Sequence, residues 1–191
     1  MKKLSFLVLS TVLFFAFKPV ETSTWTVDKV HSRMGFSVNH LGINDIEGNF
    51  TSYTCTVTQS NADFSDAVIN VTADINSINT GEEKRDGHLK GADFFDAAQF
   101  PSLTFKSKSA KKADDNTITI KGDLTLHGVT KEVELKMVHK QTIHPMTKKD
   151  VAGFTITGTI KRSDFGIGAK FPAPMLADEV MLDARGEFTK N

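Results

Sequence analysis

The sequence contains a single cysteine, Cys55, among its 191 residues, so no disulfide can form within the chain. A domain without disulfides depends on a hydrophobic core large enough to stabilise the fold alone. Tyr53, Cys55 and Val57 occupy alternate positions, and no histidine lies near them in the sequence. This pattern favours Cys55 as a small buried side chain over a catalytic thiol.

The formal net charge is zero, because 23 basic residues balance 23 acidic ones. Nucleic acids and anionic membranes are attracted by extended positive fields, so the composition argues against both as partners. Polar aromatic residues are scarce, with one Trp and one Tyr against 15 Phe. Phenylalanine carries no hydrogen-bonding group, so an interior built from it is dry unless other residues supply polarity.

The motifs of metal centres and hydrolases are absent from the sequence as well. No G-x-S-x-G motif is present, and the spacing of Asp93 and Asp96 near a helical turn favours capping over a glycosidase pair. The histidines form no i, i+4 pair and are His31, His40, His88, His127, His139 and His144. We therefore predict no metal site and no catalytic residue.

The N-terminus has the pattern of a secretory signal peptide. Lys2 and Lys3 precede an uncharged run over residues 4–17, and Lys18 closes it before it is long enough to span a bilayer. No cysteine follows directly, so a lipoprotein anchor is not indicated. We predict a signal peptide over residues 1–22, with cleavage between positions 22 and 24. The remaining residues 23–191 form one periplasmic or secreted domain without a membrane span.

Alternating apolar residues predict an antiparallel β-structure. The clearest runs cover residues 34–38, 71–75, 118–126, 133–137, 152–160 and 180–188. Residues 46–58 and 131–141 are predicted as two long single strands, and His127 with Gly128 resembles a hairpin turn. A sandwich is the alternative, but we favour an extended antiparallel barrel of about eight strands.

Small residues on the predicted inward face have two interpretations. Gly35, Gly48, Gly122, Gly153 and Gly158 leave room for an elongated apolar cavity, which suits a long hydrocarbon chain. Alternatively, they relieve strain where barrel strands bend. Periodicity alone does not choose between them.

The segment from residue 82 to residue 100 fits neither a plain strand nor a plain helix. It begins with a charged helical turn, continues through Phe94 and Phe95, and breaks at Pro101 before alternation resumes. We predict a short helix and plug that cover part of the barrel.

Several stretches together resemble the YceI family of bacterial periplasmic and secreted proteins, in the family's order and over residues 25–188. They are TWTVDKVHSRMGFSVNHLGINDIEGNF, INSINTGEEKRDGHLKGADFFDAAQFPSLTFKS, GDLTLHGVTKEVEL, and KRSDFGIG followed by DEVMLDARGEF. The resemblance implies a lipocalin-like antiparallel barrel whose tunnel binds polyisoprenoids, isoprenoid quinones or similar long amphiphiles. It implies binding without catalysis and no cofactor other than such a lipid. Some relatives dimerise, so a homodimer remains open.

The tunnel wall and its mouth supply the candidate ligand-binding residues. Alternation and motif position place on the wall Phe36, Phe50, Phe95, Phe105, Phe154 and Phe165. Arg85 and His88 fall on the family's R-D-x-H-L stretch, Arg162 begins a second polar cluster, and His40 ends a strand. These groups either receive a polar headgroup or, for the arginines, pair with nearby aspartates in a structural clasp. A solvated loop position is the simpler interpretation of His40.

The leading functional hypothesis is an exported carrier or store for a long-chain amphiphilic lipid. Two alternatives remain at this point: an enzyme that acts on a lipid in a barrel pocket, and a structural or carbohydrate-interacting β-domain with a filled core.

Export gives the first testable prediction. Residues 1–24 fused to a reporter should direct it to the periplasm or the medium and should be removed on the way. N-terminal sequencing of the mature protein is the measurement, and a mature chain that still begins at Met1 would contradict it.

Overall fold

The computed structural model describes residues 21–114 and 116–191, and the predicted signal peptide falls almost entirely outside them. The elements are β1 (Ser23–His40), β2 (Asn44–Phe50), β3 (Tyr53–Gln59), β4 (Val68–Asp74), η1 (Ile75–Ser77), β5 (Ile78–Asn79), α1 (Glu83–Lys90), β6 (Ser102–Asp114), β7 (Thr117–Leu126), β8 (Val129–Ile143), β9 (Asp150–Lys161), η2 (Arg162–Phe165) and β10 (Leu176–Lys190).

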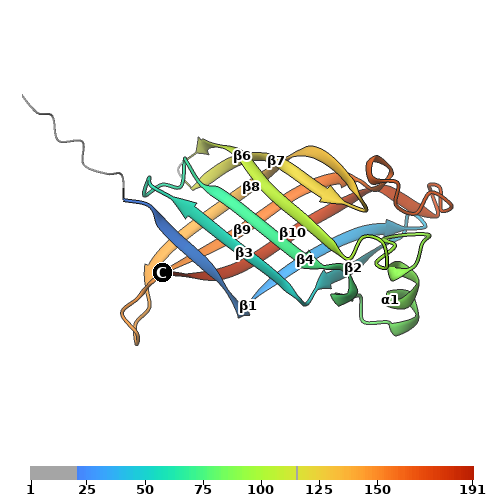
Figure 1. The fold of residues 1–191 in the computed structure, drawn as a ribbon, viewed down its shortest axis with the longest axis horizontal. Helices are drawn as coiled ribbons and strands as arrows, with labels where there is room; N and C mark the ends of the chain where they lie inside the picture. The colour runs from blue at the N-terminus through green and yellow to red at the C-terminus, as the bar shows by residue number, and fades with distance from the viewer. Residues whose placement is uncertain (1–20, 115) are drawn as a thin grey trace, which may run out of the picture.

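The strands form one antiparallel sheet that closes into a barrel (Figure 1). Their order is β10-β9-β8-β7-β6-β4-β3-β1-β2-β5, and an additional pairing of β10 with β1 completes a ring of eight strands. β2 and β5 lie beyond that ring. The predicted eight-stranded antiparallel barrel is therefore confirmed.

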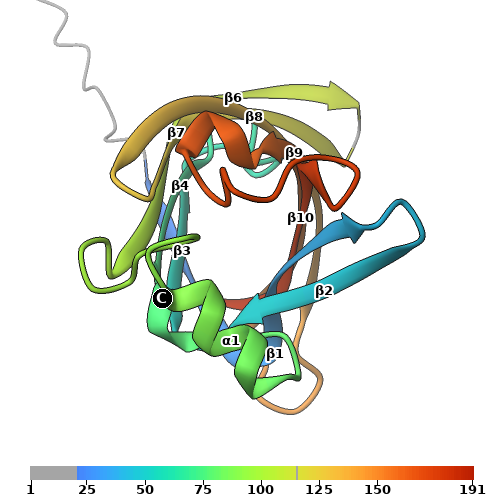
Figure 2. The ribbon, with the colours of Figure 1, turned by 90° about the vertical axis from the view of Figure 1, so that its right-hand side faces the viewer.

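β1 is the strand on which this closure depends. Its first residues, Ser23 to Thr26, pair with β3, whereas Met34 to His40 pair with β2. Its other edge pairs with β10, with a shift of register between Val27 and Ser32. Because β1 changes partner along its length, the β1–β2 hairpin projects sideways from the ring at the end where α1 lies (Figure 2).

The prediction of one long strand over residues 46–58 is wrong, because the chain turns at Thr51 and Ser52. The Thr51 amide donates to the Ser77 carbonyl at 3.1 Å, and the Ser52 amide donates to the Ser77 hydroxyl at 3.0 Å. The inward face moves from even positions such as Phe50 to odd positions such as Tyr53. The other long strand, over residues 131–141, is confirmed within β8.

α1 begins at a side-chain cap and covers one end of the barrel. The Glu82 carboxylate accepts hydrogen bonds from the backbone amides of Lys84 and Arg85, and Gly91 ends the helix. The helix has no fully buried residue, so it is not part of the core, and it lies across one side of the barrel end (Figure 2). The predicted helix and plug near residues 82–100 are confirmed in this form.

Three inward glycines provide space for side chains of the protein itself. A Cβ atom at Gly48 would lie 2.4 Å from the Phe36 ring, and one at Gly122 would lie 2.6 Å from the Phe105 ring. At Gly158 the neighbour is Leu135, at 2.4 Å. Gly122 also pairs with Ser107 beside a register shift between β6 and β7, so the strain interpretation applies there too.

Alanine substitutions at two glycines separate these effects. Gly122→Ala should destabilise the protein by about 1–3 kcal/mol, because the new methyl group meets backbone atoms that cannot move aside. Gly153→Ala is the matched control, since nothing lies within 4 Å of its Cβ position. Urea unfolding of both variants is the measurement, and equal midpoints would contradict the packing argument.

Candidate ligand-binding cavity

The barrel encloses a cavity of about 470 Å³ lined mainly by apolar side chains. Each of the eight barrel strands contributes to its wall, and β2 and α1 contribute at the end that the helix covers. An apolar space of this size suits a hydrophobic ligand with few polar groups.

Several inward-facing side chains are only partly buried because the cavity leaves them without packing partners. Phe36, Ile156, Val180 and Leu182 line the cavity and pack against the core without being fully covered. Ordinary core residues are close-packed, whereas these side chains keep apolar surface that faces the cavity. A ligand that covered this surface would gain the free energy of burying it.

An aromatic cluster closes the end of the barrel away from α1. Phe64, from the β3–β4 loop, is fully buried, and its ring centroid lies 5.8 Å from Trp25 and 5.0 Å from Phe154. His139 also packs on Phe64 at 5.0 Å, and burial lowers the pKa of its imidazole. These rings leave the α1 end as the route into the cavity.

The α1 end is framed by two loops that contact each other. Phe94 stacks on Phe171 with ring centroids 4.9 Å apart, and His88 lies edge-on to both rings. The Gly168 amide donates to the Asp93 carbonyl at 3.0 Å, and Lys170 pairs with the Asp93 carboxylate at 2.6 Å. The entrance is therefore an aromatic frame fastened by polar contacts at its rim.

Arg162 organises the loop that forms one side of this frame. The residue is buried, and every N–H of its guanidinium donates to a backbone carbonyl. The acceptors are Ala177 at 2.9 Å, Ile167 at 2.9 Å, Gly168 at 2.7 Å, Leu176 at 3.0 Å, and Phe171. The expected pairing of Arg162 with a carboxylate is not found among these contacts. With all five donors used, Arg162 holds the loop and has none left for a headgroup.

Arg85 has a similar role at the start of α1. Its Nε donates to the Thr80 hydroxyl at 2.7 Å, and one terminal nitrogen donates to the Thr80 carbonyl at 2.8 Å. Asp86 accepts from the Thr80 amide at 2.9 Å, so both residues fasten Thr80 to the helix. The geometry fits the structural interpretation of this motif, with Thr80 in place of the expected aspartate partner.

All but one of the remaining predicted ligand-binding residues line the cavity. Phe36, Phe50, Phe95, Phe105 and Phe154 line the cavity, as do His40 and His88 near its entrance. Phe165 differs, because it is fully buried in η2 but does not contribute to the cavity wall.

Sequence reasoning missed cavity residues of two kinds. Ile156, Val180 and Leu182 follow the same alternation as the phenylalanines and could have been found from it. Phe171 and Met175 lie in a loop without periodicity, where no local pattern marks a residue that faces the interior.

Cys55 lines the cavity but is not suited to nucleophilic chemistry. Burial raises the pKa of its thiol to about 12, so the side chain stays protonated at neutral pH.

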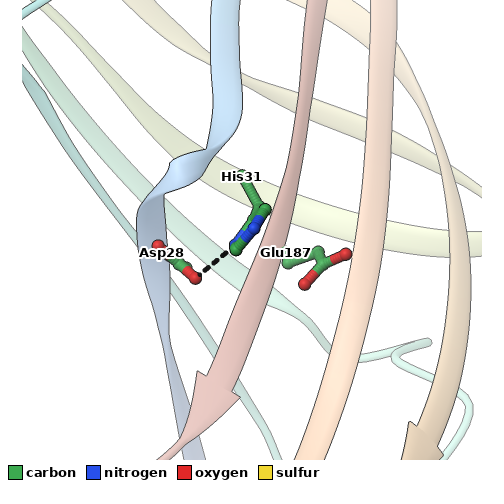
Figure 3. A group of neighbouring side chains, drawn as sticks. All are labelled: Asp28, His31 and Glu187. Atoms are coloured by element: carbon green, nitrogen blue, oxygen red, sulfur yellow. Dashed lines mark hydrogen bonds and ion pairs between the residues drawn. The ribbon is translucent and has the colours of Figure 1, made fainter.

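A separate cluster of possible metal ligands lies on the β1 bulge (Figure 3). Donor atoms of Asp28, His31 and Glu187 lie within 4.8 Å of one another. Asp28 already accepts from the Val30 amide and from His31 Nδ1, both at 2.9 Å. The hydrogen bond to Asp28, with the charges of both carboxylates, raises the pKa of His31. The contacts account for the cluster as an exposed ion pair that holds the bulge.

Comparison with known proteins identifies the domain. The model of the YceI-like domain matches residues 25–188. A UPF0312 protein of Staphylococcus aureus is 35% identical over 175 residues, covering 87% of this chain and 98% of that protein. No helix within the described part of the chain has the length and apolar character of a membrane span.

Solved structures show the same fold. The Campylobacter jejuni YceI protein matches with a TM-score of 0.73 and 31% identity, covering 80% of this chain and 90% of that one. A polyisoprenoid-binding domain from Saccharophagus degradans, implicated in plant cell wall breakdown, has a TM-score of 0.61 and 15% identity. It is matched over its whole length and over 90% of this chain.

Arg162 provides a test of the loop architecture. Arg162→Met should lower the free energy of unfolding by about 3 kcal/mol or more, because it leaves buried carbonyl groups without donors. Arg185→Met is the control: Arg185 is exposed and pairs with Asp183 at the surface, so its loss should change the free energy of unfolding far less. Chemical denaturation measures both, and similar losses in the two variants would argue against the clasp.

Proposed function

The chain belongs to the YceI-like domain family, and we propose that it is an exported protein that holds a long-chain amphiphile in its barrel. The observation that carries this proposal is the set of inward apolar side chains that remain partly uncovered around the cavity. Polyisoprenoids and isoprenoid quinones are ligands of the appropriate class, because their branched hydrocarbon chains would cover this surface.

The shape of the cavity supports a carrier or storage role. One end is closed by the cluster around Phe64, and the other is framed by loops that Arg162 and Asp93 fasten. A chain that enters at the α1 end is shielded from water along the barrel. The polyisoprenoid-binding domain of Saccharophagus degradans has the same fold, which supports a similar use of the interior here.

Binding without turnover is favoured by the state of the reactive groups. The Cys55 thiol is protonated, and the Arg162 guanidinium has no free donor for a developing negative charge. His88 packs against Phe94 and lies 3.9 Å from Asp93, at the rim and not in the apolar interior. We therefore infer that the bound molecule is carried unchanged.

The position of β1 supports export of the barrel as a unit. Its first residue is Ser23, so cleavage after residue 22 leaves every strand intact. The mature domain would then begin directly with the strand that pairs with both β3 and β10.

A cavity-filling pair of variants tests the proposed function. Leu182 faces the cavity, whereas its neighbour Met181 points outward and is 58% exposed. Leu182→Trp should weaken lipid binding roughly 5- to 150-fold, the equivalent of an overlap of about 1–3 kcal/mol. Met181→Trp should bind as the unmodified protein does, because it leaves the interior unchanged.

The protein is purified from its own host, and mass spectrometry of the lipid extracted from it identifies the ligand. Displacement titration with that lipid gives the affinities of both variants. Thermal melting of both variants checks that they fold. A folded Leu182→Trp protein with undiminished lipid binding would place the ligand outside the barrel and refute the proposal.

A further inference from the structure

Two exposed segments at the α1 end of the barrel carry apolar side chains and no charge. One is the turn of the β1–β2 hairpin over residues 41–43, and the other is the loop over residues 172–175. Leu41 is 52% exposed, Ile43 is 80% exposed and Met175 is 48% exposed. We call residues 41–43 and 172–175 together the apolar patch.

The two segments of the apolar patch are fixed to each other and to the barrel. The Leu41 amide donates to the Met175 carbonyl at 3.1 Å. The buried Arg162 donates to the carbonyls of Phe171 and Leu176, one on each side of the loop. The apolar patch is therefore a defined surface of the fold, held by the same guanidinium that frames the entrance.

The hairpin turn places an apolar side chain where the backbone favours a different residue. The Ile43 amide donates to the His40 carbonyl at 3.2 Å, and φ is +58° at Leu41 and +70° at Gly42. Positive φ at both central residues is typical of a type I′ turn, for which Asn-Gly is the preferred sequence. A leucine with positive φ is strained, and departures from local preference of this kind concentrate at functional sites.

The apolar patch adjoins the entrance to the cavity. Met175 belongs to both, because its side chain is exposed at the surface and also lines the cavity wall. His40, which directly precedes the turn, lines the cavity as well. A hydrocarbon chain that enters beside Met175 therefore passes from one apolar surface to another.

The backbone of the apolar patch is suited to surroundings with little water. The amides of Leu41, Ile43 and Met175 are bonded within the protein, and Pro172 and Pro174 have no N–H group. An unpaired backbone donor is costly to move from water into lipid. Most positions of the patch avoid that cost.

We propose, on the basis of the function proposed above, that the apolar patch docks on the surface of a lipid bilayer and that the amphiphile passes between bilayer and cavity there. The occupant follows from the ligand: a long-chain amphiphile dissolves in a bilayer and not in water, so its carrier has to present its entrance to the bilayer. Leu41, Ile43 and Met175 enter the boundary between headgroups and acyl chains.

Apolar contact, and not charge, holds the protein at the bilayer. The formal net charge of the chain is zero, so there is no general attraction to anionic lipids. The contact is weak and reversible, because only a few side chains enter the lipid, and the loaded protein can leave again.

Vesicles of phosphatidylcholine, which carry no net charge, provide the test surface. The double variant Leu41→Asn/Ile43→Thr removes both exposed apolar side chains of the turn and restores the preferred Asn-Gly sequence, so it should fold at least as well as the unmodified protein. Its affinity for the vesicles should fall about tenfold, because less apolar surface is buried on docking. Docking of the unmodified protein should not weaken as the salt concentration rises.

The double variant Ile143→Thr/Met146→Asn is the matched control. Ile143 and Met146 are 62% and 86% exposed, but the connection between β8 and β9 lies at the other end of the barrel (Figure 1). The control removes a similar amount of exposed apolar surface and should dock as the unmodified protein does. An equal loss of docking in the two double variants would overturn the inference.

Transfer of a ligand separates docking from ligand binding. Lipid-free protein is mixed with phosphatidylcholine vesicles that contain an isoprenoid quinone, and the quinone bound to the protein is measured after the vesicles are removed by flotation. Leu41→Asn/Ile43→Thr should load about tenfold more slowly than the unmodified protein. Its affinity for the quinone in detergent solution should be unchanged, because neither Leu41 nor Ile43 is among the side chains that line the cavity.

The outcomes separate this inference from the function on which it rests. If the unmodified protein binds the quinone in detergent but does not bind the vesicles, the proposed function stands and docking on lipid is wrong. The inference is also wrong if Leu41→Asn/Ile43→Thr docks and loads as the unmodified protein does. If the unmodified protein takes up the quinone neither from detergent nor from vesicles, the proposed function fails, and this inference fails with it.

Discussion

The closure of the sheet by the pairing of β1 with β10 is the constraint on which the rest of the structure depends. A closed ladder of eight strands fixes the width of the interior, and inward side chains must then fill whatever space results. Here rings and branched chains lie over glycines of neighbouring strands, as Phe105 does over Gly122, yet they do not meet across the centre. The cavity is the space left in the barrel after the side chains of neighbouring strands have packed against one another.

The two ends of the barrel use aromatic residues in opposite ways. At the closed end, Phe64 is surrounded by other rings and by His139, so nothing enters there. At the open end, Phe94 and Phe171 stack on each other at the rim, and their loops are held by Asp93 and by the buried Arg162. The buried guanidinium of Arg162 donates only to backbone carbonyls, whereas Lys170 and Asp93 form a side-chain ion pair at the rim. The two ends of the barrel therefore differ: packed rings close one, and the other is the route into the cavity.

Alternation in the sequence was sufficient to predict the barrel and much of its apolar wall, because each inward position of a strand leaves a local mark. The turn at Thr51 and Ser52 was missed because alternation was followed through a change of parity between Phe50 and Tyr53. The partners of Arg162 could not be predicted, since its acceptors are backbone carbonyls that any residue provides. Contacts between distant loops, such as that of Phe171 with Phe94, leave no periodic signal either.

β2 lies outside the closed ring, although its residues Ile46 and Phe50 still line the cavity near its entrance. Reshaping β2 breaks no strand pairing of the ring itself, because β2 pairs only with β1 and β5. The entrance can therefore be reshaped through β2 while the eight strands that set the width of the cavity keep their pairings.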